Sequence, residues 1–239
     1  MRCDLFEKFA TQLQKIHSFL FQYPPVHKNF ITRSISDRKM TTPIFCYGSN
    51  GIDQIRERCQ NPYLIARPAL LQNYIRIFGG ESKRWDHGAV ASILNLPTAE
   101  NTLDGKKSNK VYGSVVDLTP TEVDLLDVFE GVRFGIYRRV KVMGKVKPHV
   151  ENVTIKQKGK NIHDCVNTQE DELKDEECEV YILNQKYSGW VREPSRRYLL
   201  AIQKNLEPFW IEKNNNKFSI EICNENGEHI STWVNDYLY

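Results

Sequence analysis

The sequence predicts an α+β protein. Strand-like runs alternate irregularly with three segments of helical periodicity, so the strict strand–helix repeat of a doubly wound fold is missing. The chain has 239 residues, 40% of them hydrophobic, which is enough to bury one substantial core. We predict strands at 43–47, 69–78, 88–94, 111–117, 137–143 and 178–184, and helices at 52–59, 120–130 and 195–206.

Composition argues against several classes of protein. The formal net charge of +3 is too small for a nucleic-acid-binding surface, which usually shows a basic stripe. No uninterrupted apolar segment of membrane-spanning length and no recognisable secretory signal is seen, so we expect no membrane partner. The six cysteines lack the spacing of metal ligands, and we expect reduced thiols and no metal site.

The first strand-like run ends in a glycine-containing turn. Residues 44–47 read Ile-Phe-Cys-Tyr, residues 48–51 read Gly-Ser-Asn-Gly, and the helix at 52–59 follows directly. Backbone N–H groups that meet at such a turn bind carboxylates or phosphates, and Gly48 would let a ligand approach the backbone closely. An ordinary turn without a ligand explains the same residues, so both interpretations stay open for this motif alone.

The helix at 120–130 is the best-marked element. Thr119 is a good N-cap, Pro120 suits the first helical position, and Glu122 completes a capping box. Glu130 falls on the apolar side of this helix, in the last turn before Gly131. The apolar side comprises Val123, Leu125, Leu126 and Phe129.

Glu130 allows two interpretations. Burial and the negative end of the helix dipole both oppose its charged form, as suits a carboxyl group that gives and takes protons. Most glutamates at helix ends instead lie on the surface, where Glu130 would pair with Arg133, Arg138 or Arg139. The helix pattern by itself favours the surface interpretation, and the loop motif at 47–50 shifts the balance toward the first.

Together, these two motifs resemble the gamma-glutamylcyclotransferase family. The resemblance spans about residues 43 to 210, and its specificity comes from the order and separation of short pieces that would each be common alone. The matching pieces are Tyr-Gly-Ser-Asn at 47–50, then 65–68 with 78–79, 87–93, 111–116, Phe-Glu-Gly-Val at 129–132 with 135–137, 178–183 and 194–198.

The resemblance implies a fold and a reaction. The fold would be a small mixed β-barrel with flanking helices and a pocket at the ends of its strands. The reaction would need no cofactor: the free α-amine of a gamma-glutamyl group attacks its own γ-carbonyl, expels an amine and leaves 5-oxoproline. The substrate would be a small gamma-glutamyl peptide or amine, which places the enzyme among acyltransferases or lyases and in glutathione metabolism.

The resemblance also implies the site residues. Glu130 would be the catalytic proton shuttle, and the loop at 47–50 would grip the glutamyl group through backbone amides. Tyr137 and Tyr198 match positions near the family's pocket, where a phenol offers an aromatic wall and a hydrogen-bonding tip. Tyr181 also matches, but its apolar strand needs an aromatic residue anyway. The predicted substrate-binding residues are Tyr47, Gly48, Ser49, Asn50, Tyr137 and Tyr198.

Segments outside this core complete the predicted organisation. We predict an N-terminal extension at 1–40, a gamma-glutamylcyclotransferase-like domain at 41–212, and a C-terminal hairpin extension at 213–239. Within the domain, 145–178 is predicted to be an acidic, mobile loop, with a lid over the pocket as the alternative. The hairpin is expected to bury one side through Phe218, Ile220, Ile222, Ile230, Trp233 and Val234.

The expected partner is a small-molecule gamma-glutamyl substrate, with a homodimer left open. We expect a cytoplasmic protein; an amphipathic stretch from Leu5 to Phe21 leaves a mitochondrial location open, although Asp4 and Glu7 argue against a transit peptide. A second class of function also remains, a non-catalytic ligand-binding or protein-interaction module with the same fold. Glu130 favours the enzyme, because a binding module has no need of a desolvated acid.

Overall fold

The computed structural model describes residues 41–96, 109–149, 168–210 and 217–236. The chain divides into two units, Met1–Lys39 and Met40–Tyr239, and every element below belongs to the second. The predicted extension at 1–40 lies outside the described residues.

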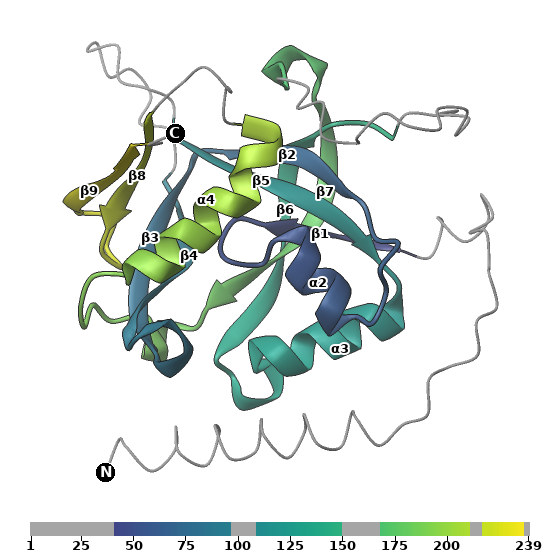
Figure 1. The fold of residues 1–239 in the computed structure, drawn as a ribbon. Coiled ribbons are helices and arrows are strands. Elements are labelled where there is room, and N and C mark those ends of the chain that lie inside the picture. Colours follow the sequence, from purple (N-terminus) through teal and green to yellow (C-terminus); the bar gives the residue numbers. More distant parts are fainter. Residues whose placement is uncertain (1–40, 97–108, 150–167, 211–216, 237–239) are drawn as a thin grey trace. The chain divides into compact units, whose positions relative to one another are not determined.

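A closed five-stranded barrel forms the centre of this unit (Figure 1). Around the barrel the strands follow the order β1-β5-β2-β6-β7, and all neighbours are antiparallel except β1 and β7, whose parallel pairing closes it. The α+β class and the small mixed barrel with flanking helices are therefore confirmed. The barrel strands are β1 (Thr42–Cys46), β2 (Ala66–Gln72), β5 (Lys110–Leu118), β6 (Tyr137–Val146) and β7 (Lys174–Leu183).

Three helices and two hairpins surround the barrel. The hairpins are separate two-stranded sheets, and the C-terminal one confirms the predicted hairpin. The helices are α2 (Ile52–Arg58), α3 (Pro120–Glu130) and α4 (Arg196–Trp210); the hairpins pair β3 (Tyr74–Ser82) with β4 (Gly88–Asn95) and β8 (Lys217–Cys223) with β9 (His229–Asp236).

Strand alternation separates two cores. Successive side chains on β1 point to opposite faces, so Phe45 joins one hydrophobic cluster while Ile44 and Cys46 join another. The Phe45 cluster also contains inward residues of the other barrel strands and the apolar side of α4. The Ile44 cluster packs β1 and β5 against α2 and α3. This second packing brings the C-terminal end of α3 to the loop that follows β1.

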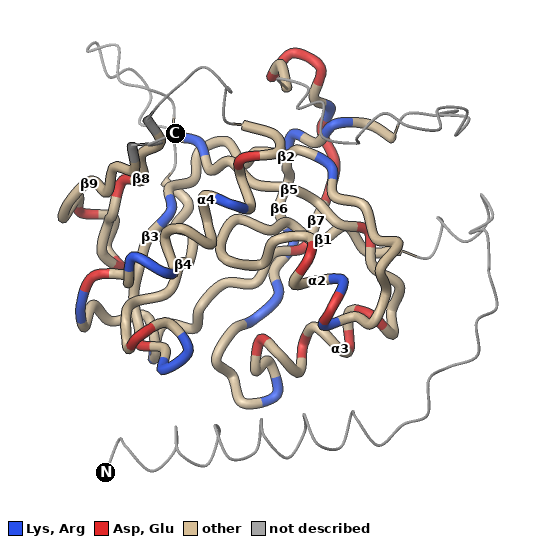
Figure 2. The backbone as a smooth tube through the Cα atoms, in the orientation of Figure 1, with Lys and Arg blue, Asp and Glu red and all other residues tan. Residues whose placement is uncertain are grey.

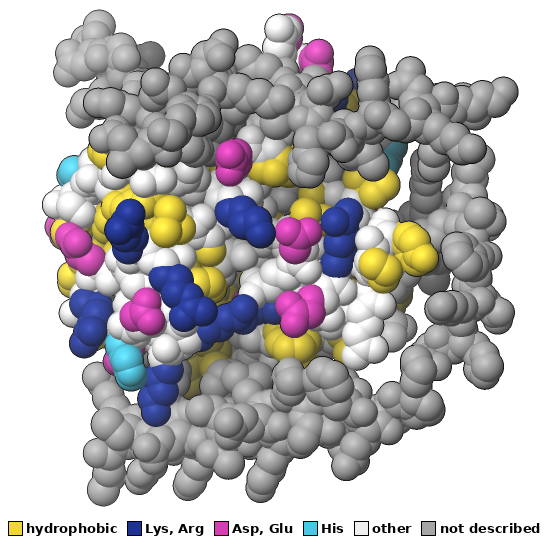
Figure 3. Space-filling model, in the orientation of Figure 1, with side chains coloured by type: hydrophobic (Ala, Val, Ile, Leu, Met, Phe, Trp, Pro, Cys, Tyr) yellow, Lys and Arg dark blue, Asp and Glu magenta, His cyan; other side chains and the backbone are white. Residues whose placement is uncertain are grey.

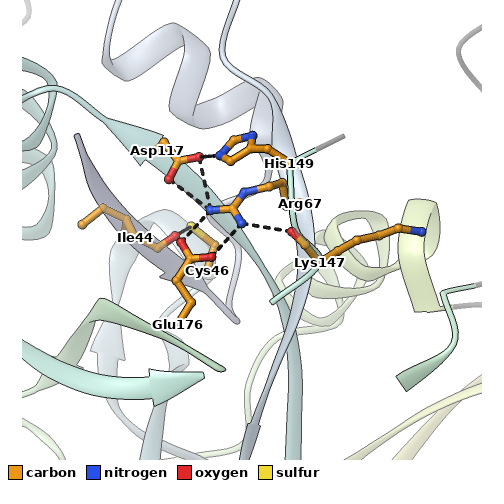
Figure 4. Close-up of polar contacts among 7 residues, drawn as sticks. All are labelled: Ile44, Cys46, Arg67, Asp117, Lys147, His149 and Glu176. Carbon is orange, nitrogen blue, oxygen red and sulfur yellow. Dashed lines mark hydrogen bonds and ion pairs between the residues drawn. The ribbon is translucent and has the colours of Figure 1, made fainter. Parts of the chain in front are cut away.

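An ion cluster lies inside the barrel at the end opposite that loop (Figure 4). Arg67 on β2 donates to Glu176 on β7 through two bonds of 2.8 Å and to Asp117 on β5 at 3.1 Å. It also donates to the carbonyl of Lys147 at 3.0 Å, while its Nε is buried without a partner. His149 contacts Asp117 at 2.9 Å from the rim. The position of this arginine allows one cation to hold three strands together.

Two sequence-based boundaries were wrong. The single strand predicted at 69–78 is two strands in different sheets, because Asn73 adopts a positive φ of 64° between β2 and β3 and turns the chain. The acidic run predicted to be loop becomes β7 from Lys174 onward, where its carboxylates meet basic residues of β6 (Figure 2). These pairs are Lys141 with Glu177, Lys145 with Asp175 and Arg139 with Glu179.

The C-terminal hairpin buries fewer residues than predicted. Ile220 and Ile222 are buried, whereas Ile230 and Val234 are exposed. The register explains this difference: Ile220 lies opposite Trp233, so the odd-numbered residues of β9 share the inward face and Ile230 and Val234 point away.

Candidate active site

The catalytic candidate sits where the sequence predicted a helix end. In α3, Thr119 accepts from the Glu122 N–H, and the Glu122 carboxylate accepts from the Thr119 N–H, so the capping box is present. Gly131 ends the helix with a φ of 65°, which only a residue without a Cβ adopts readily. Because both ends of α3 are set locally, its last residue, Glu130, is held in a definite place.

Glu130 is buried, with 9% of its surface exposed, and one of its oxygens is tied down. Oε1 accepts from Arg58 Nη1 at 2.7 Å and from Asn50 Nδ2 at 3.0 Å. Asn50 Oδ1 in turn accepts from the same Arg58 nitrogen at 2.9 Å. The surface interpretation, in which Glu130 pairs with Arg133, Arg138 or Arg139, is wrong: the partner is Arg58, 72 residues away.

The other carboxylate oxygen of Glu130 is available. Oε2 receives no hydrogen bond from any described residue. The described polar side-chain atoms that are buried without a partner are Arg67 Nε and Ser114 Oγ, so Oε2 is accessible rather than buried. Arg58 therefore balances the charge of the carboxylate and fixes its orientation while leaving one oxygen to exchange a proton.

The loop at 47–50 is held from behind through its carbonyls. The Tyr47 carbonyl accepts from Arg76 Nε at 3.1 Å, and the Gly48 carbonyl accepts from Asn205 Nδ2 at 3.0 Å. In a trans peptide the N–H points opposite to the C=O, so the N–H groups of Gly48 and Ser49 point away from these two side chains. Within the described residues, neither N–H has a backbone acceptor outside the strand ladders. The loop thus presents free donors on one side.

Gly48 is needed for space. A Cβ at this position would lie 3.2 Å from Tyr198 Oη and 3.7 Å from the Ala91 Cβ, and the φ of Gly48 is not positive. The structure therefore places Tyr198 directly against the loop. The reason for glycine here is the close approach of a side chain, rather than an unusual backbone conformation.

Three of the predicted tyrosines meet at one residue of β4, Ala91. The Ala91 N–H donates to Tyr198 Oη at 2.9 Å, and the Ala91 carbonyl accepts from Tyr47 Oη at 3.4 Å and from Tyr137 Oη at 3.5 Å. Tyr47 Oη also donates to the Tyr181 carbonyl at 2.6 Å, so its phenol links β4 to β7. Tyr181 points elsewhere and donates to Asp127 at 2.7 Å.

Burial keeps these phenols neutral. It raises the pKa of Tyr47 and of Tyr137 well above the ordinary value of 10, and the negative charge of Glu130 adds to both shifts. For Tyr198, burial outweighs the hydrogen bond from Ala91 and raises the pKa to about 12. All three therefore act as hydrogen-bonding groups rather than as bases at neutral pH.

A basic rim lies beside Glu130. Arg84 and Arg197 lie 5.3 and 5.6 Å from the ring centroid of Trp85, and that ring contacts Tyr198 at 5.0 Å between centroids. Burial lowers the pKa of Arg84, and the positive charges of Arg58 and Arg197 lower it further. Figure 3 shows Lys and Arg side chains gathered across the face between α4 and α2.

Acids act on the rim without contacting it: the negative charges of Glu57 and Glu130 oppose the lowering of the Arg84 pKa but do not outweigh it. Within the described part of the chain, neither Arg84 nor Arg197 has a carboxylate within ion-pair distance. We define the basic rim as Arg84, Trp85 and Arg197.

Sequence reasoning missed several residues of this arrangement. Arg58 is the last residue of α2, whereas Asn50 precedes that helix, so no helix periodicity links the two residues. Ala91, Arg76 and Asn205 carried no local signal, because they act through main-chain atoms or reach the loop from distant elements. Among the described residues, no group of His, Cys, Asp and Glu could hold a metal ion. No helix described in this chain is long and apolar enough to cross a membrane.

Comparison with known proteins gives similar solved structures only. No family model and no curated protein matches this chain. A structure titled gamma-glutamyl cyclotransferase is 24% identical, covers 70% of this chain and 79% of its own, and has a TM-score of 0.46. A yeast gamma-glutamyl cyclotransferase described as specific to glutathione is 14% identical, with 74% and 91% covered and a TM-score of 0.45.

A mouse AIG2-like protein is also similar, at 15% identity, with 74% of this chain and 98% of its own covered and a TM-score of 0.38. Several of the solved structures that resemble this chain are thus named gamma-glutamyl cyclotransferase or AIG2-like.

Proposed function

We propose that this chain is a gamma-glutamylcyclotransferase, which converts the gamma-glutamyl group of a small peptide or amine to 5-oxoproline and releases the amine. The observation that carries the proposal is the accessible Oε2 of a buried carboxylate, Glu130, next to a loop with outward-facing N–H groups. An acid in such a position suits proton transfer, and the N–H groups suit an anion.

The reaction needs one residue to move protons. Glu130 Oε2 accepts a proton from the substrate α-ammonium, and the resulting amine attacks the γ-carbonyl carbon. As the C–N bond to the leaving group breaks, the same oxygen gives that proton to the departing nitrogen. The ring nitrogen then loses its second proton, which the released amine takes up as an ammonium group, so 5-oxoproline keeps one N–H and the carboxylate is regenerated. Since nucleophile and electrophile belong to one molecule, most of the acceleration comes from orientation.

The loop and the tyrosines supply that orientation. The N–H groups of Gly48 and Ser49 bind the α-carboxylate of the substrate or the developing oxyanion. Tyr137 and Tyr198 form a wall whose hydroxyl groups stay protonated over the working pH range, because burial raises the pKa of each. Asn50 links the loop to Glu130 through its 3.0 Å hydrogen bond. This bond holds the carboxylate of Glu130 at a fixed position relative to the N–H groups of the loop.

The basic rim supports a leaving amine that carries a carboxylate. Arg84 and Arg197 repel each other, so a negatively charged group between them would relieve that repulsion. A gamma-glutamyl amino acid or peptide has such a carboxylate, whereas a gamma-glutamyl alkylamine has none. We infer that peptides with a free terminal carboxylate are the preferred substrates.

The test of the reaction is 5-oxoproline formation from a panel of gamma-glutamyl compounds by the purified chain. Glu130→Gln keeps the shape of the side chain but removes the proton acceptor, and we expect a loss of about 100-fold or more in kcat. The matched control is Asp124→Asn, an exposed carboxylate on the same helix, which should change kcat little. Turnover near the wild-type rate by Glu130→Gln would refute the assignment; substrate binding without turnover by the unaltered chain would favour a binding module.

The test of the leaving group uses a matched pair of substrates. Gamma-glutamylalanine and gamma-glutamylethylamine differ only in the carboxylate, and we expect the first to have a kcat/KM at least about 10-fold higher. Arg84→Gln and Arg197→Gln should reduce that ratio, whereas Arg192→Gln, an exposed arginine before α4, should not. If the ratio of the two kcat/KM values is unchanged in both rim variants, the rim does not recognise the leaving group. The proposed reaction would not be affected by that result.

A further inference from the structure

A cavity of about 150 Å³ lies behind the candidate active-site loop, between β3, β5, α4 and β8. It is roughly ten times the ~10–15 Å³ that one water molecule requires, so it admits a molecule of several heavy atoms. The residues that line it are Arg76, Lys110, Tyr112, Leu206, Trp210, Phe218 and Ser219.

Two cations face this cavity, and only one has a described counter-ion. Lys110 contacts Glu170 at 2.5 Å, and the same carboxylate accepts from Tyr112 Oη at 2.7 Å. Arg76 donates only to carbonyls, those of Tyr47 at 3.1 Å and Tyr112 at 3.0 Å, and no described carboxylate lies within ion-pair distance of it. Among the residues that the structure describes, Arg76 is therefore the cation of this cavity without a counter-ion.

The charge of Arg76 persists despite its surroundings. Burial lowers its pKa to about 10, which still leaves the guanidinium charged at neutral pH. Arg76 is partly exposed, and a partly desolvated charge is unfavourable unless an anion or several hydrogen bonds compensate it. Two carbonyl acceptors occupy only part of the five donor positions of a guanidinium, so the group retains capacity for a further acceptor.

The remaining walls are aromatic and apolar. The rings of Tyr112 and Trp210 lie 4.9 Å apart between centroids, and the Trp210 indole is fixed by its bond to the Gly113 carbonyl at 2.7 Å. Phe218 and Leu206 complete this apolar lining. One positive charge at one side and flat apolar walls elsewhere suit a singly charged acid with a small flat or aliphatic body.

We propose that this cavity is a binding site for a small monocarboxylate, whose carboxylate pairs with Arg76 and whose apolar part lies against Tyr112 and Trp210. The site is distinct from the Glu130 pocket and does not depend on the proposed reaction. It is nevertheless coupled to that pocket, because Arg76 Nε also holds the Tyr47 carbonyl. A carboxylate that pairs with Arg76 would therefore contact the same side chain that holds the loop at 47–50.

The test is direct binding by the full chain, with acetate and benzoate as probes and acetamide and benzamide as neutral counterparts. We expect the carboxylates to raise Tm and to shift the Arg76 side-chain Nε–Hε and Gly48 amide NMR signals, and the amides to do neither. Arg76→Gln should weaken binding by about 10-fold or more.

A second variant tests the cavity without changing Arg76. It is needed because Arg76 also donates to two carbonyls, so Arg76→Gln alone would not separate lost binding from misfolding. Ser219 is the exposed member of the lining, so Ser219→Phe places a large ring at the mouth of the cavity and leaves Arg76 in place, and it should obstruct carboxylate binding without lowering Tm. The control is Lys204→Gln, which removes an exposed charge from α4 outside the cavity lining and should bind as the wild type does. Equal binding of the amides, absence of carboxylate binding, or wild-type affinity in Ser219→Phe would overturn the proposal.

Discussion

Arg67→Met should destabilise the barrel strongly, although methionine matches much of the volume of arginine. The change leaves Asp117 and Glu176 facing each other without the cation that now lies between them (Figure 4). Removing one partner of a buried ion pair costs about 3–5 kcal/mol. We expect the lower end, because the Asp117 and Glu176 side chains retain 18% and 32% exposure and keep some hydration.

The assay is urea denaturation combined with thermal melting. For a domain of this size a loss of about 3 kcal/mol corresponds to a fall in Tm of roughly 6–12 °C. The loss should be smaller at pH 4 than at pH 7. In the variant, Asp117 keeps only its contact with His149 and Glu176 loses both bonds from Arg67, so acid relieves the repulsion between the two carboxylates.

A charge-neutral combination provides the decisive comparison. Arg67→Met together with Asp117→Asn and Glu176→Gln removes the repulsion as well as the cation, and should recover at least about half of the lost stability. If the single variant loses less than about 1 kcal/mol, or if the triple variant is no more stable than the single one, the ion cluster does not hold the barrel as argued here.

Three further predictions concern the loop, the ends of the chain and acid stability. Gly48→Val should impair substrate binding more than folding, because its side chain must displace Tyr198 Oη, which lies 3.2 Å from the Cβ position; KM and Tm measured together would separate the two effects. A chain starting at Met40 should keep its Tm and activity, and a lower activity would give residues 1–39 a role. Truncation after Lys213 should cost about 3–6 kcal/mol in the free energy of unfolding, since it removes the buried Ile220 and Ile222, and an unchanged urea midpoint would contradict that. Lys110 holds the pKa of Glu170 below its ordinary value of 4.5, so this pair adds a small stability above pH 4.5 that is lost on acidification; Glu170→Gln should flatten that part of a Tm–pH curve.

Local interactions explain what the sequence by itself determined. The start of α3 depends on Thr119, Pro120 and Glu122, and its end depends on Gly131, so all the relevant contacts span four residues or fewer. Glu130 could therefore be placed at a helix end on the apolar side, but the helix pattern by itself favoured a surface position, and its burial was expected only together with the loop motif at 47–50. Strand alternation likewise predicted the C-terminal hairpin, although its inward face needed the register of Ile220 opposite Trp233.

The division between β2 and β3 shows where such reasoning stops. Residues 69–78 are mostly apolar, and the Gln72-Asn73 pair within them was not enough to predict that Asn73 would take a positive φ and send the chain into a second sheet. The acidic run before β7 was also misjudged, because the basic residues of β6 that balance it lie about 30–40 positions away. A charged run is typical of a loop, but it forms a strand when the neighbouring strand carries residues of opposite charge.

Tertiary structure alone decided the chemistry of the candidate site. Arg58 and Glu130 are 72 residues apart, and Tyr198 reaches the Ala91 peptide across 107 residues. The first pair meets because α2 and α3 pack in one hydrophobic cluster, and the second because β4 and α4 pack in the other, and no periodicity within one segment encodes either packing. The sequence determined that Glu130 is the last residue of a helix, because the capping residues that set both helix ends are neighbours along the chain. The fold decided which of its oxygens is free, because that depends on donors from a distant loop and helix.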